Sequence, residues 1–220
     1  MSESVVEARP RHAMTPSTIF VVDDDPSARK SLTRLVASAG YAVEAFASAG
    51  DFLTHEPFAR PCCVLLDVRM PGLNGLDLQE TLARSGHQVP IVFMTGHGDI
   101  SMSVTAMKRG AVDFLTKPFD VESLLEAIER AVTKDVKDLG EEHRAADVRE
   151  RVERLSPRET EVLALVVTGK LNKQIAGELG ICEKTVKVHR ARVMEKMRAG
   201  SVAELVRLAD LAGVVSERRR

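Results

Sequence analysis

The chain has 220 residues, of which 44% are hydrophobic and 29% charged, and its formal net charge is −1. This length suits one large domain or two small ones, and the composition is that of an ordinary globular protein. No apolar run reaches the roughly 20 residues that cross a bilayer, and the first residues lack the apolar core of a secretion signal. Three cysteines at unrelated spacing make neither a disulfide framework nor a zinc site, so we expect a cytoplasmic protein without a membrane partner.

The near-zero net charge is the sum of two parts of opposite sign. Residues 154–220 carry 14 basic and 8 acidic residues, whereas residues 1–153 carry 17 basic and 24 acidic residues. The C-terminal part is therefore net basic by +6, and the remainder is net acidic by −7. The total does not exclude a nucleic-acid partner, because a basic domain can balance an acidic one.

The first residues show no hydrophobic periodicity and contain two prolines, so we expect a disordered tail over 1–17. From Thr18 onward, short apolar runs alternate with amphipathic stretches of helical length. The predicted strands are 19–22, 41–43, 63–66, 91–94 and 112–115, and the predicted helices are 26–39, 48–55, 76–84, 99–109 and one that begins at Val121. Near-continuous apolar strands that alternate with helices are typical of a parallel sheet covered on both faces.

The helical pattern from Val121 continues into a charge-dense stretch between Lys134 and Arg154. Mixed charges at i,i+4 spacing favour a solvated helix without a buried face, which Gly140 could interrupt. From Leu155 onward the pattern is entirely helical. The predicted domains are therefore an α/β domain, a helical linker and an all-α domain, over 18–136, 137–153 and 154–220.

Polar side chains follow four of the predicted strands, at the edge where parallel sheets bind their ligands. In chain order they are Asp23, Asp24, Asp25, Asp67, Thr95 and Lys117. A single Asp after a strand is usually a turn or cap residue, and Asp25 before Pro26 fits a helix N-cap. Converging carboxylates repel one another unless a cation or a proton intervenes, and oxygen ligands suit Mg²⁺ or Mn²⁺. A metal-bound carboxylate beside an ammonium and a hydroxyl can accept a phosphoryl group as a mixed anhydride.

Residues 18–136 closely resemble the receiver domain of bacterial two-component response regulators, through the motifs IFVVDDD, CCVLLDVRMPGLNG, IVFMTGHGD and GAVDFLTKPF. The resemblance implies a flavodoxin-like, five-stranded parallel sheet, with Asp67 phosphorylated by a histidine kinase. The implied ligands of the metal ion are Asp23, Asp24, Asp67 and the backbone carbonyl of Arg69. The resemblance further implies that Thr95 and Lys117 contact the phosphoryl oxygens and that the Lys117–Pro118 bond is cis. Phe114 would be an aromatic switch.

The C-terminal segment contains the start and turn signals of a helix-turn-helix. Ser156 with Glu159 fits a capping box, Asn172 marks a second helix start, and Gly180 supplies a tight turn. At about 100° per residue, the helix expected over 183–198 has an apolar face of Val186, Val193, Met194 and Met197. The opposite face carries Lys184, Thr185, Lys187, Val188, Ala191 and Arg192. Cations around two small apolar side chains suit a helix in a major groove, with the cations on phosphates and the small side chains near base edges.

This segment resembles the DNA-binding domain of the LuxR/FixJ/NarL class, through LSPRETEVL, NKQIA and TVKVHRARVMEKM. The resemblance implies a four-helix helix-turn-helix domain, with 184–197 as the recognition helix and about 202–212 as a dimerising helix. Asn172, Lys173 and Thr185 would then contact phosphates. Cys182 stands where the family commonly has a serine cap, and because a thiol caps poorly we expect a helix start weaker by about 1 kcal/mol.

Together these features predict a cytoplasmic transcriptional response regulator rather than an enzyme. After phosphorylation it would form a homodimer, bind double-stranded DNA and contact RNA polymerase. One alternative is an aspartyl-phosphate phosphatase, which would need a second carboxylate where Arg69 stands. The other is a regulator that no longer responds to phosphate, which the complete acidic set argues against. The kinase, the operator, the pathway and any role of Cys182 stay open.

Overall fold

The computed structural model describes residues 17–55, 57–96 and 100–214 and divides the chain into two compact units, Met1–Leu139 and Gly140–Arg220. Of the tail expected over 1–17, all but Ser17 lies outside the described residues, and Ser17 is buried. Within the described ranges, no helix is both long enough and apolar enough to cross a membrane.

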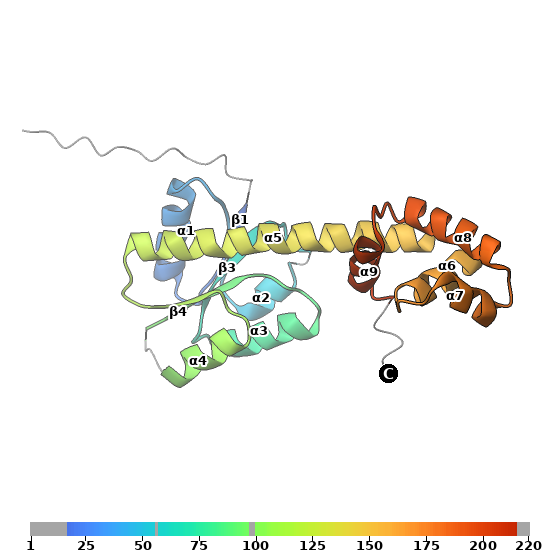
Figure 1. Cartoon of the computed structure of the whole chain (residues 1–220). Helices are drawn as coiled ribbons and strands as arrows, with labels where there is room; N and C mark the ends of the chain where they lie inside the picture. Colours follow the sequence, from blue (N-terminus) through green and yellow to red (C-terminus); the bar gives the residue numbers. More distant parts are fainter. Residues whose placement is uncertain (1–16, 56, 97–99, 215–220) are drawn as a thin grey trace, which may run out of the picture. The chain divides into compact units, whose positions relative to one another are not determined.

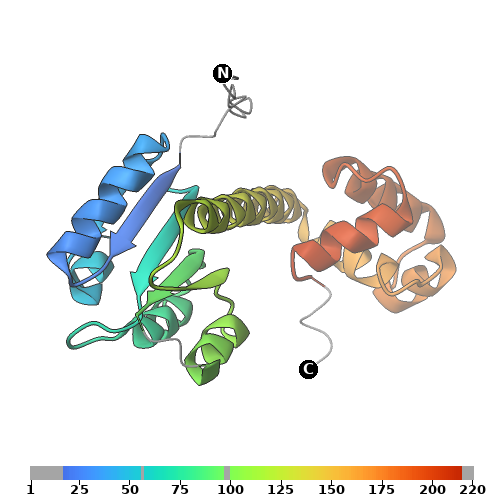
Figure 2. The same ribbon diagram turned by 90° about the vertical axis from the view of Figure 1, so that its left-hand side faces the viewer.

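The first unit is a five-stranded parallel sheet with helices on both faces (Figures 1 and 2). Its strands are β1 (Thr18–Val22), β2 (Ala42–Phe46), β3 (Cys62–Asp67), β4 (Ile91–Thr95) and β5 (Asp113–Thr116). Its helices are α1 (Pro26–Ser38), α2 (Ala49–Leu53), α3 (Gly75–Arg84), α4 (Ile100–Lys108) and the first part of α5 (Val121–Glu153). The strand order β2-β1-β3-β4-β5 confirms the predicted flavodoxin-like fold.

Alternation of side chains along the strands gives the sheet two buried faces. Ile19 and Val21 of β1 face a cluster formed with α1 and α5, whereas Phe20 and Val22 face a cluster formed with α2, α3 and α4. Because both faces are covered, the central strands are apolar at nearly every position, which explains their continuous hydrophobic runs. The edge strand β2 is only partly buried and runs to Phe46, three residues beyond the predicted 41–43.

The direction of the strands places all their carboxyl ends at one edge of the sheet. The strand order reverses between β1 and β3, which is where doubly wound sheets bind their ligands. Val22 at the end of β1 pairs with Leu66 in β3, so the next residues, Asp23 and Asp67, are neighbours. The sheet therefore brings together carboxylates that are 44 positions apart in the sequence.

Helix α5 runs without interruption through Gly140. The prediction that its charge-dense part has no buried face is wrong at Asp135, Ala145 and Val148, which are 0%, 9% and 1% exposed. Asp135 is buried because its carboxylate accepts hydrogen bonds from the Arg60 guanidinium and from the Cys62 backbone N–H. Val148 is buried because it packs into the core of the second unit.

The second unit is entirely helical in its described part, with the end of α5 followed by α6 (Pro157–Val166), α7 (Asn172–Leu179), α8 (Glu183–Lys196) and α9 (Val202–Leu211). The predicted capping box is confirmed, since the Glu159 N–H donates to Ser156 Oγ and the Ser156 N–H donates to Glu159 Oε2. Gly180 turns the chain between α7 and α8 with a φ of +64°. Asn172 is the first residue of α7, and Leu171 occupies the cap position.

Candidate functional site

Three carboxylates gather at the carboxyl ends of β1 and β3. One oxygen each from Asp23, Asp24 and Asp67 lies within 4.8 Å of the others. Asp23 is completely buried, Asp24 is exposed, and the side chain of Asp67 is 12% exposed. The exposure of the three carboxylates to solvent therefore increases from Asp23 through Asp67 to Asp24.

Asp23 is hydrogen-bonded at both carboxylate oxygens and at both polar atoms of its backbone. Its Oδ1 accepts from the Asp25 N–H at 2.9 Å, and its Oδ2 accepts from Lys117 Nζ at 2.8 Å. Its carbonyl accepts from the Arg29 guanidinium at 2.6 Å, and its own N–H donates to the Phe46 carbonyl. Asp25 in turn caps α1 by accepting from the Ser27 N–H, as predicted.

Lys117 reaches the carboxylates from the loop after β5. Its Nζ lies 2.8 Å from Asp23 Oδ2 and 3.5 Å from Asp67 Oδ1. Its backbone N–H donates to the Thr95 carbonyl at 2.6 Å, and the bond to Pro118 is cis, as expected. Partial burial acts to lower the pKa of Lys117, but the hydrogen bond and charge of Asp23, helped by Asp67, outweigh it and raise that pKa. Lys117 is therefore a stable cation at the site.

The pKa of Asp67 is raised, chiefly because burial disfavours its charged form. Asp23 and Asp24 add to the increase, while the opposite charge and hydrogen bond of Lys117 reduce it. One ammonium thus does not offset three carboxylates. The site favours a further positive charge near Asp67.

The backbone that carries Asp67 is packed tightly against the start of α3. The Gly75 N–H donates to the Val68 carbonyl at 3.0 Å. A Cβ on Gly75 would lie 2.6 Å from the Asp67 carbonyl oxygen and 3.1 Å from Val68 Cα. This role of Gly75 was not predicted from the sequence, although the Asn-Gly pair before an amphipathic stretch is a signal for a cap followed by a close approach of the backbone.

The other predicted residues of this site lie on neighbouring elements. Thr95 is fully buried at the end of β4. Phe114 is half-buried in β5, packs with the core that includes Met102, and has its ring centroid 6.1 Å from that of Phe93. Arg69 is exposed in the loop after β3.

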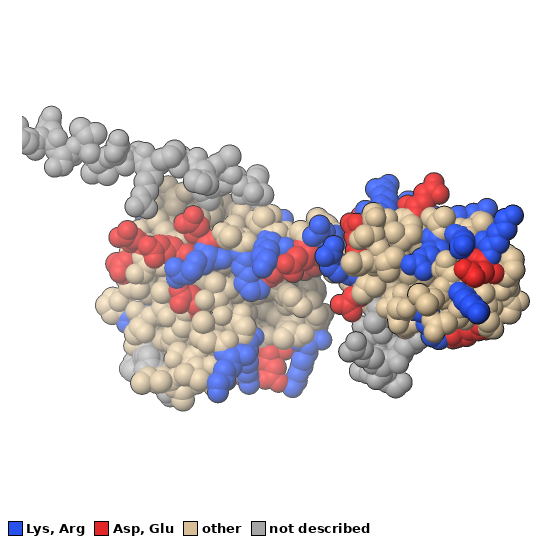
Figure 3. All heavy atoms as spheres, viewed as in Figure 1, with Lys and Arg blue, Asp and Glu red and all other residues tan. Residues whose placement is uncertain are grey.

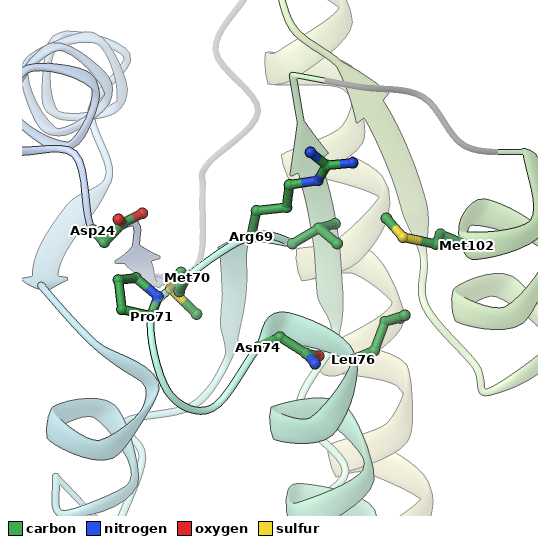
Figure 4. A pocket seen from close by; sticks show the side chains of 8 residues that line it. Asp24, Arg69, Met70, Pro71, Asn74, Leu76 and Met102 are labelled. Atoms are coloured by element: carbon green, nitrogen blue, oxygen red, sulfur yellow. The ribbon is translucent and has the colours of Figure 1, made fainter.

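A cleft of about 500 Å³ opens beside the carboxylates (Figure 4). Asp24 and Met102 lie on opposite sides of the loop that follows β3, and Arg69 projects from that loop between them. The remaining lining is mostly apolar and consists of Val68, Met70, Pro71, Asn74 and Leu76. The cleft gives molecules from solvent an approach to the edge of the acidic cluster.

In the second unit, α8 has the two faces predicted from its periodicity. Val186, Val193 and Met197 are fully buried, and Met194 is partly buried against the same core. The opposite side is exposed at Lys184, Lys187, Val188, Ala191 and Arg192, and half-exposed at Thr185. Figure 3 shows Lys and Arg side chains gathered over α8.

Three of the predicted contact residues on this surface have partners within the unit, namely Asn172, Thr185 and Lys187, whose Nζ lies 3.8 Å from Glu183 Oε1. Asn172 accepts a hydrogen bond from Arg190 at 2.9 Å, while Lys173 beside it is exposed. Cys182 is the N-cap of α8 but makes no capping hydrogen bond, as its weak acceptor predicts. Its Sγ lies 3.1 Å from Thr185 Oγ1, and this hydrogen bond, with backbone N–H groups of the helix start, lowers the pKa of the thiol.

Comparison with known families assigns each unit. Residues 19–129 match the response regulator receiver domain, and residues 153–209 match the bacterial regulatory proteins of the luxR family. Nodulation protein W of Bradyrhizobium diazoefficiens is 50% identical over 92% of this chain and 89% of its own length. The transcriptional regulatory protein FixJ of the same organism is 45% identical over 92% of this chain and 99% of its own length.

A solved structure of the response regulator StyR is similar to most of this chain. It is 46% identical, covers 89% of this chain and 99% of its own, and superposes with a TM-score of 0.75. FixJ is named a transcriptional regulatory protein and the luxR family comprises bacterial regulatory proteins, so the family is one of transcriptional regulators rather than enzymes. The chain therefore belongs to the response regulators that join a receiver domain to a LuxR-type helix-turn-helix, and it is a phosphorylatable regulator of transcription.

Proposed function

We propose that Asp67 is the phosphoryl acceptor and that its donor is a phosphohistidine on a partner histidine kinase. Asp23 is buried and bonded at both carboxylate oxygens, whereas Asp67 keeps an exposed fraction and lies 3.5 Å from the Lys117 ammonium. Asp24 is exposed and has no described contact with Lys117. Of the three carboxylates, Asp67 therefore best combines access with a neighbouring cation, and this observation carries the proposal.

The donor set fits a divalent cation. Three carboxylate oxygens within 4.8 Å of one another are hard ligands, and one ammonium does not offset their charge. Asp23, Asp24, Asp67 and the backbone carbonyl of Arg69 would hold Mg²⁺, or Mn²⁺ in its place. When bound, the ion would neutralise charge on the carboxylates and on the phosphoryl oxygens.

In the proposed transfer, an Asp67 carboxylate oxygen attacks the phosphorus and the P–N bond to the imidazole breaks. The imidazole nitrogen keeps the electron pair of that bond and takes a proton from solvent, and Asp67 becomes an acyl phosphate. Lys117 pairs with the phosphoryl oxygens, and the Thr95 hydroxyl donates a hydrogen bond to one of them. Phe114 then turns into the space that Thr95 leaves, which changes the surface formed by α4 and β5.

That surface fits the homodimer expected after phosphorylation. Ile100, Val104 and Met107 of α4 are 80%, 45% and 45% exposed. Their spacing of four and three residues places them on one side of the helix. A second copy of the receiver that covers this side would remove the apolar side chains from water.

The DNA interface that we propose is the exposed side of α8 together with the start of α7. Lys184, Lys187 and Arg192 would contact phosphates, and Val188 and Ala191 would lie near base edges and thymine methyls. Asn172, Lys173 and Thr185 would contact the backbone at the edge of the groove. The supporting observation is that this side is exposed while the other side of α8 forms the core. Regulation at the promoter would then involve RNA polymerase, in the cytoplasm, with transcriptional activation as the usual outcome.

We further propose 18–136 as the receiver and 154–220 as the DNA-binding domain, with the 137–153 part of α5 between them. The extent of the two family matches, 19–129 and 153–209, supports this assignment. Val148 of the 137–153 segment packs into the core of the second unit, so the last part of that segment is packed with the DNA-binding domain.

Labelling with a small phosphodonor tests the acceptor. The wild-type chain with Mg²⁺ and phosphoramidate should gain one phosphoryl group by mass, and Asp67→Asn should gain none. Asp24→Asn is the matched control variant, since it should still be labelled but should require a higher concentration of Mg²⁺. Persistent labelling of Asp67→Asn at one site would refute the assignment.

DNA selection from random sequence, with phosphorylated and unphosphorylated protein in parallel, tests the output. Lys187→Ala should weaken binding to selected and random duplexes alike and make the salt dependence shallower by about one unit of slope. Unchanged affinity would remove Lys187 from the interface.

A further inference from the structure

Arg198 is the only residue other than glycine with a positive φ in the described part of the chain. Its φ is +53°, and it directly follows Met197, the C-cap of α8. An L side chain in this conformation is strained, because its Cβ approaches the following carbonyl oxygen. The strain lies at the end of the helix for which we propose DNA contact.

The backbone around Arg198 is a complete Schellman motif. The Arg198 N–H donates to the Glu195 carbonyl at 3.0 Å, and the Ala199 N–H donates to the Met194 carbonyl at 2.9 Å. Glycine is the usual residue at this position, since it adopts the left-handed conformation without strain. At every other described position with a positive φ the chain has glycine, namely Gly40, Gly72, Gly86, Gly110, Gly169, Gly180 and Gly213.

The guanidinium of Arg198 does not contribute a contact that would explain its presence. Arg198 is exposed, and no ion pair or side-chain hydrogen bond of it occurs among the described residues. A cation near the C-terminus of a helix is favourable, but Lys196 already supplies one in the last turn of α8. A strained residue with an unpaired charge is more typical of a binding surface than of a structural position.

We propose that Arg198 binds a DNA phosphate beside the groove that α8 occupies. This inference rests on the proposed DNA interface of α8 and extends it past the end of the helix. The unit carries a net charge of +6 over 154–220, and Arg192 is exposed on the same helix less than two turns earlier. A guanidinium suits phosphate because its planar donors match two oxygens at once.

Arg198→Gly removes the strain and the cation together, and the two effects are measured separately, the strain by stability and the cation by DNA affinity. In the full chain, we expect the unfolding equilibrium constant of the second unit to fall about threefold to tenfold. Affinity for a mixed-sequence duplex should fall about threefold to tenfold, and the slope of log affinity against log salt should become shallower by about one. Arg198→Lys keeps the charge, so it should retain most of the affinity without the gain in stability.

Arg149→Gln on α5 is the matched control, because it removes one exposed cation from the same unit and lies outside α8 and α9. It should change the affinity and the salt slope less than Arg198→Gly does. Equal losses in the two variants would assign the effect to net charge and overturn the proposal. So would an Arg198→Gly variant that is more stable but binds DNA as the wild type does. In that case a loss confined to transcription assays would point to a polymerase contact instead.

Failure of this inference is distinguishable from failure of the α8 interface. If Lys187→Ala weakens DNA binding and Arg198→Gly does not, α8 remains the interface and only the contact of Arg198 is wrong. If neither variant changes DNA binding, the α8 interface itself is wrong.

Discussion

Gly75→Ala tests how tightly the start of α3 supports the loop that carries Asp67. The added methyl would lie 2.6 Å from the Asp67 carbonyl oxygen, well inside the 3.4 Å at which ordinary contact begins. The obstacle is backbone on two sides and the Phe93 ring, 3.1 Å away, on a third, so no flexible side chain can move aside. The start of α3 and the end of β3 must therefore separate.

The magnitude follows from two opposing effects. Overpacking of this kind costs about 1–3 kcal/mol, whereas alanine in place of glycine at a helical position gains up to about 1 kcal/mol. We expect a net loss of about 1–2 kcal/mol in the first unit. The separation also displaces the backbone of Asp67 and Val68, so the rate of labelling by phosphoramidate with Mg²⁺ should fall.

The chain offers a selective probe for this experiment. It contains no tryptophan and a single tyrosine, Tyr41, which lies in the first unit, so tyrosine fluorescence during urea denaturation follows that unit alone. Gly140→Ala is the control, because Gly140 lies inside α5 with nothing within 4 Å of an added Cβ. That variant should gain about 0.5–1 kcal/mol, measured by circular dichroism of the helices. A Gly75→Ala protein with wild-type stability and labelling rate would refute the reasoning.

Three further substitutions probe buried charge and the helix cap. Burial, with a smaller effect of Asp23 and Asp24, raises the pKa of Asp67 above its ordinary 3.8, so ionised Asp67 destabilises the fold at pH values above that raised pKa. Without metal, Asp67→Asn should therefore be more stable than the wild type at pH 7, and this gain should disappear below pH 3.8. A gain in stability that persists in acid would contradict this cause. Asp135→Ala leaves the Arg60 guanidinium without its buried partner and should cost about 3–5 kcal/mol by Tyr41 fluorescence; a loss below 1 kcal/mol would show that water replaces the carboxylate. Cys182→Ser restores a capping acceptor and should stabilise the second unit by about 1 kcal/mol in thermal melts, whereas an unchanged melting temperature would mean that the cap is not limiting.

The acidic site was predictable because its residues follow a local rule. Asp23, Asp24, Asp67, Thr95 and Lys117 each lie within two residues of the end of a predicted apolar run, and parallel strands place such positions at one edge whatever their separation in sequence. The strand register then pairs Val22 with Leu66 and makes Asp23 and Asp67 neighbours. The roles assigned to these residues came from the family resemblance, and they stay predictions until labelling is measured.

The buried pair of Arg60 and Asp135 was not predictable in the same way. The two residues are 75 positions apart, and Asp135 lies in a stretch whose composition indicates a solvated helix. Only the packing of α5 against the start of β3 places its carboxylate beside the Cys62 N–H. Burial of a charge depends on a partner far along the chain, which neither periodicity nor charge patterning records.

The net charge of the second unit, counted from the sequence, likewise does not show which of its cations are engaged inside the unit. A net +6 over 154–220 suggests a broad basic surface, but several of the cations that contribute to it are engaged inside the unit. Lys196 pairs with the buried Glu159, Arg190 donates to Asn172, and Arg158 donates to the Leu179 carbonyl. These bonds hold α8 and its neighbours together. Among the described cations without such a bond, Lys184, Arg192 and Arg198 lie on the exposed side of α8 or just beyond its end. A net charge therefore predicts the class of partner, whereas the pairing of each cation decides which face meets it.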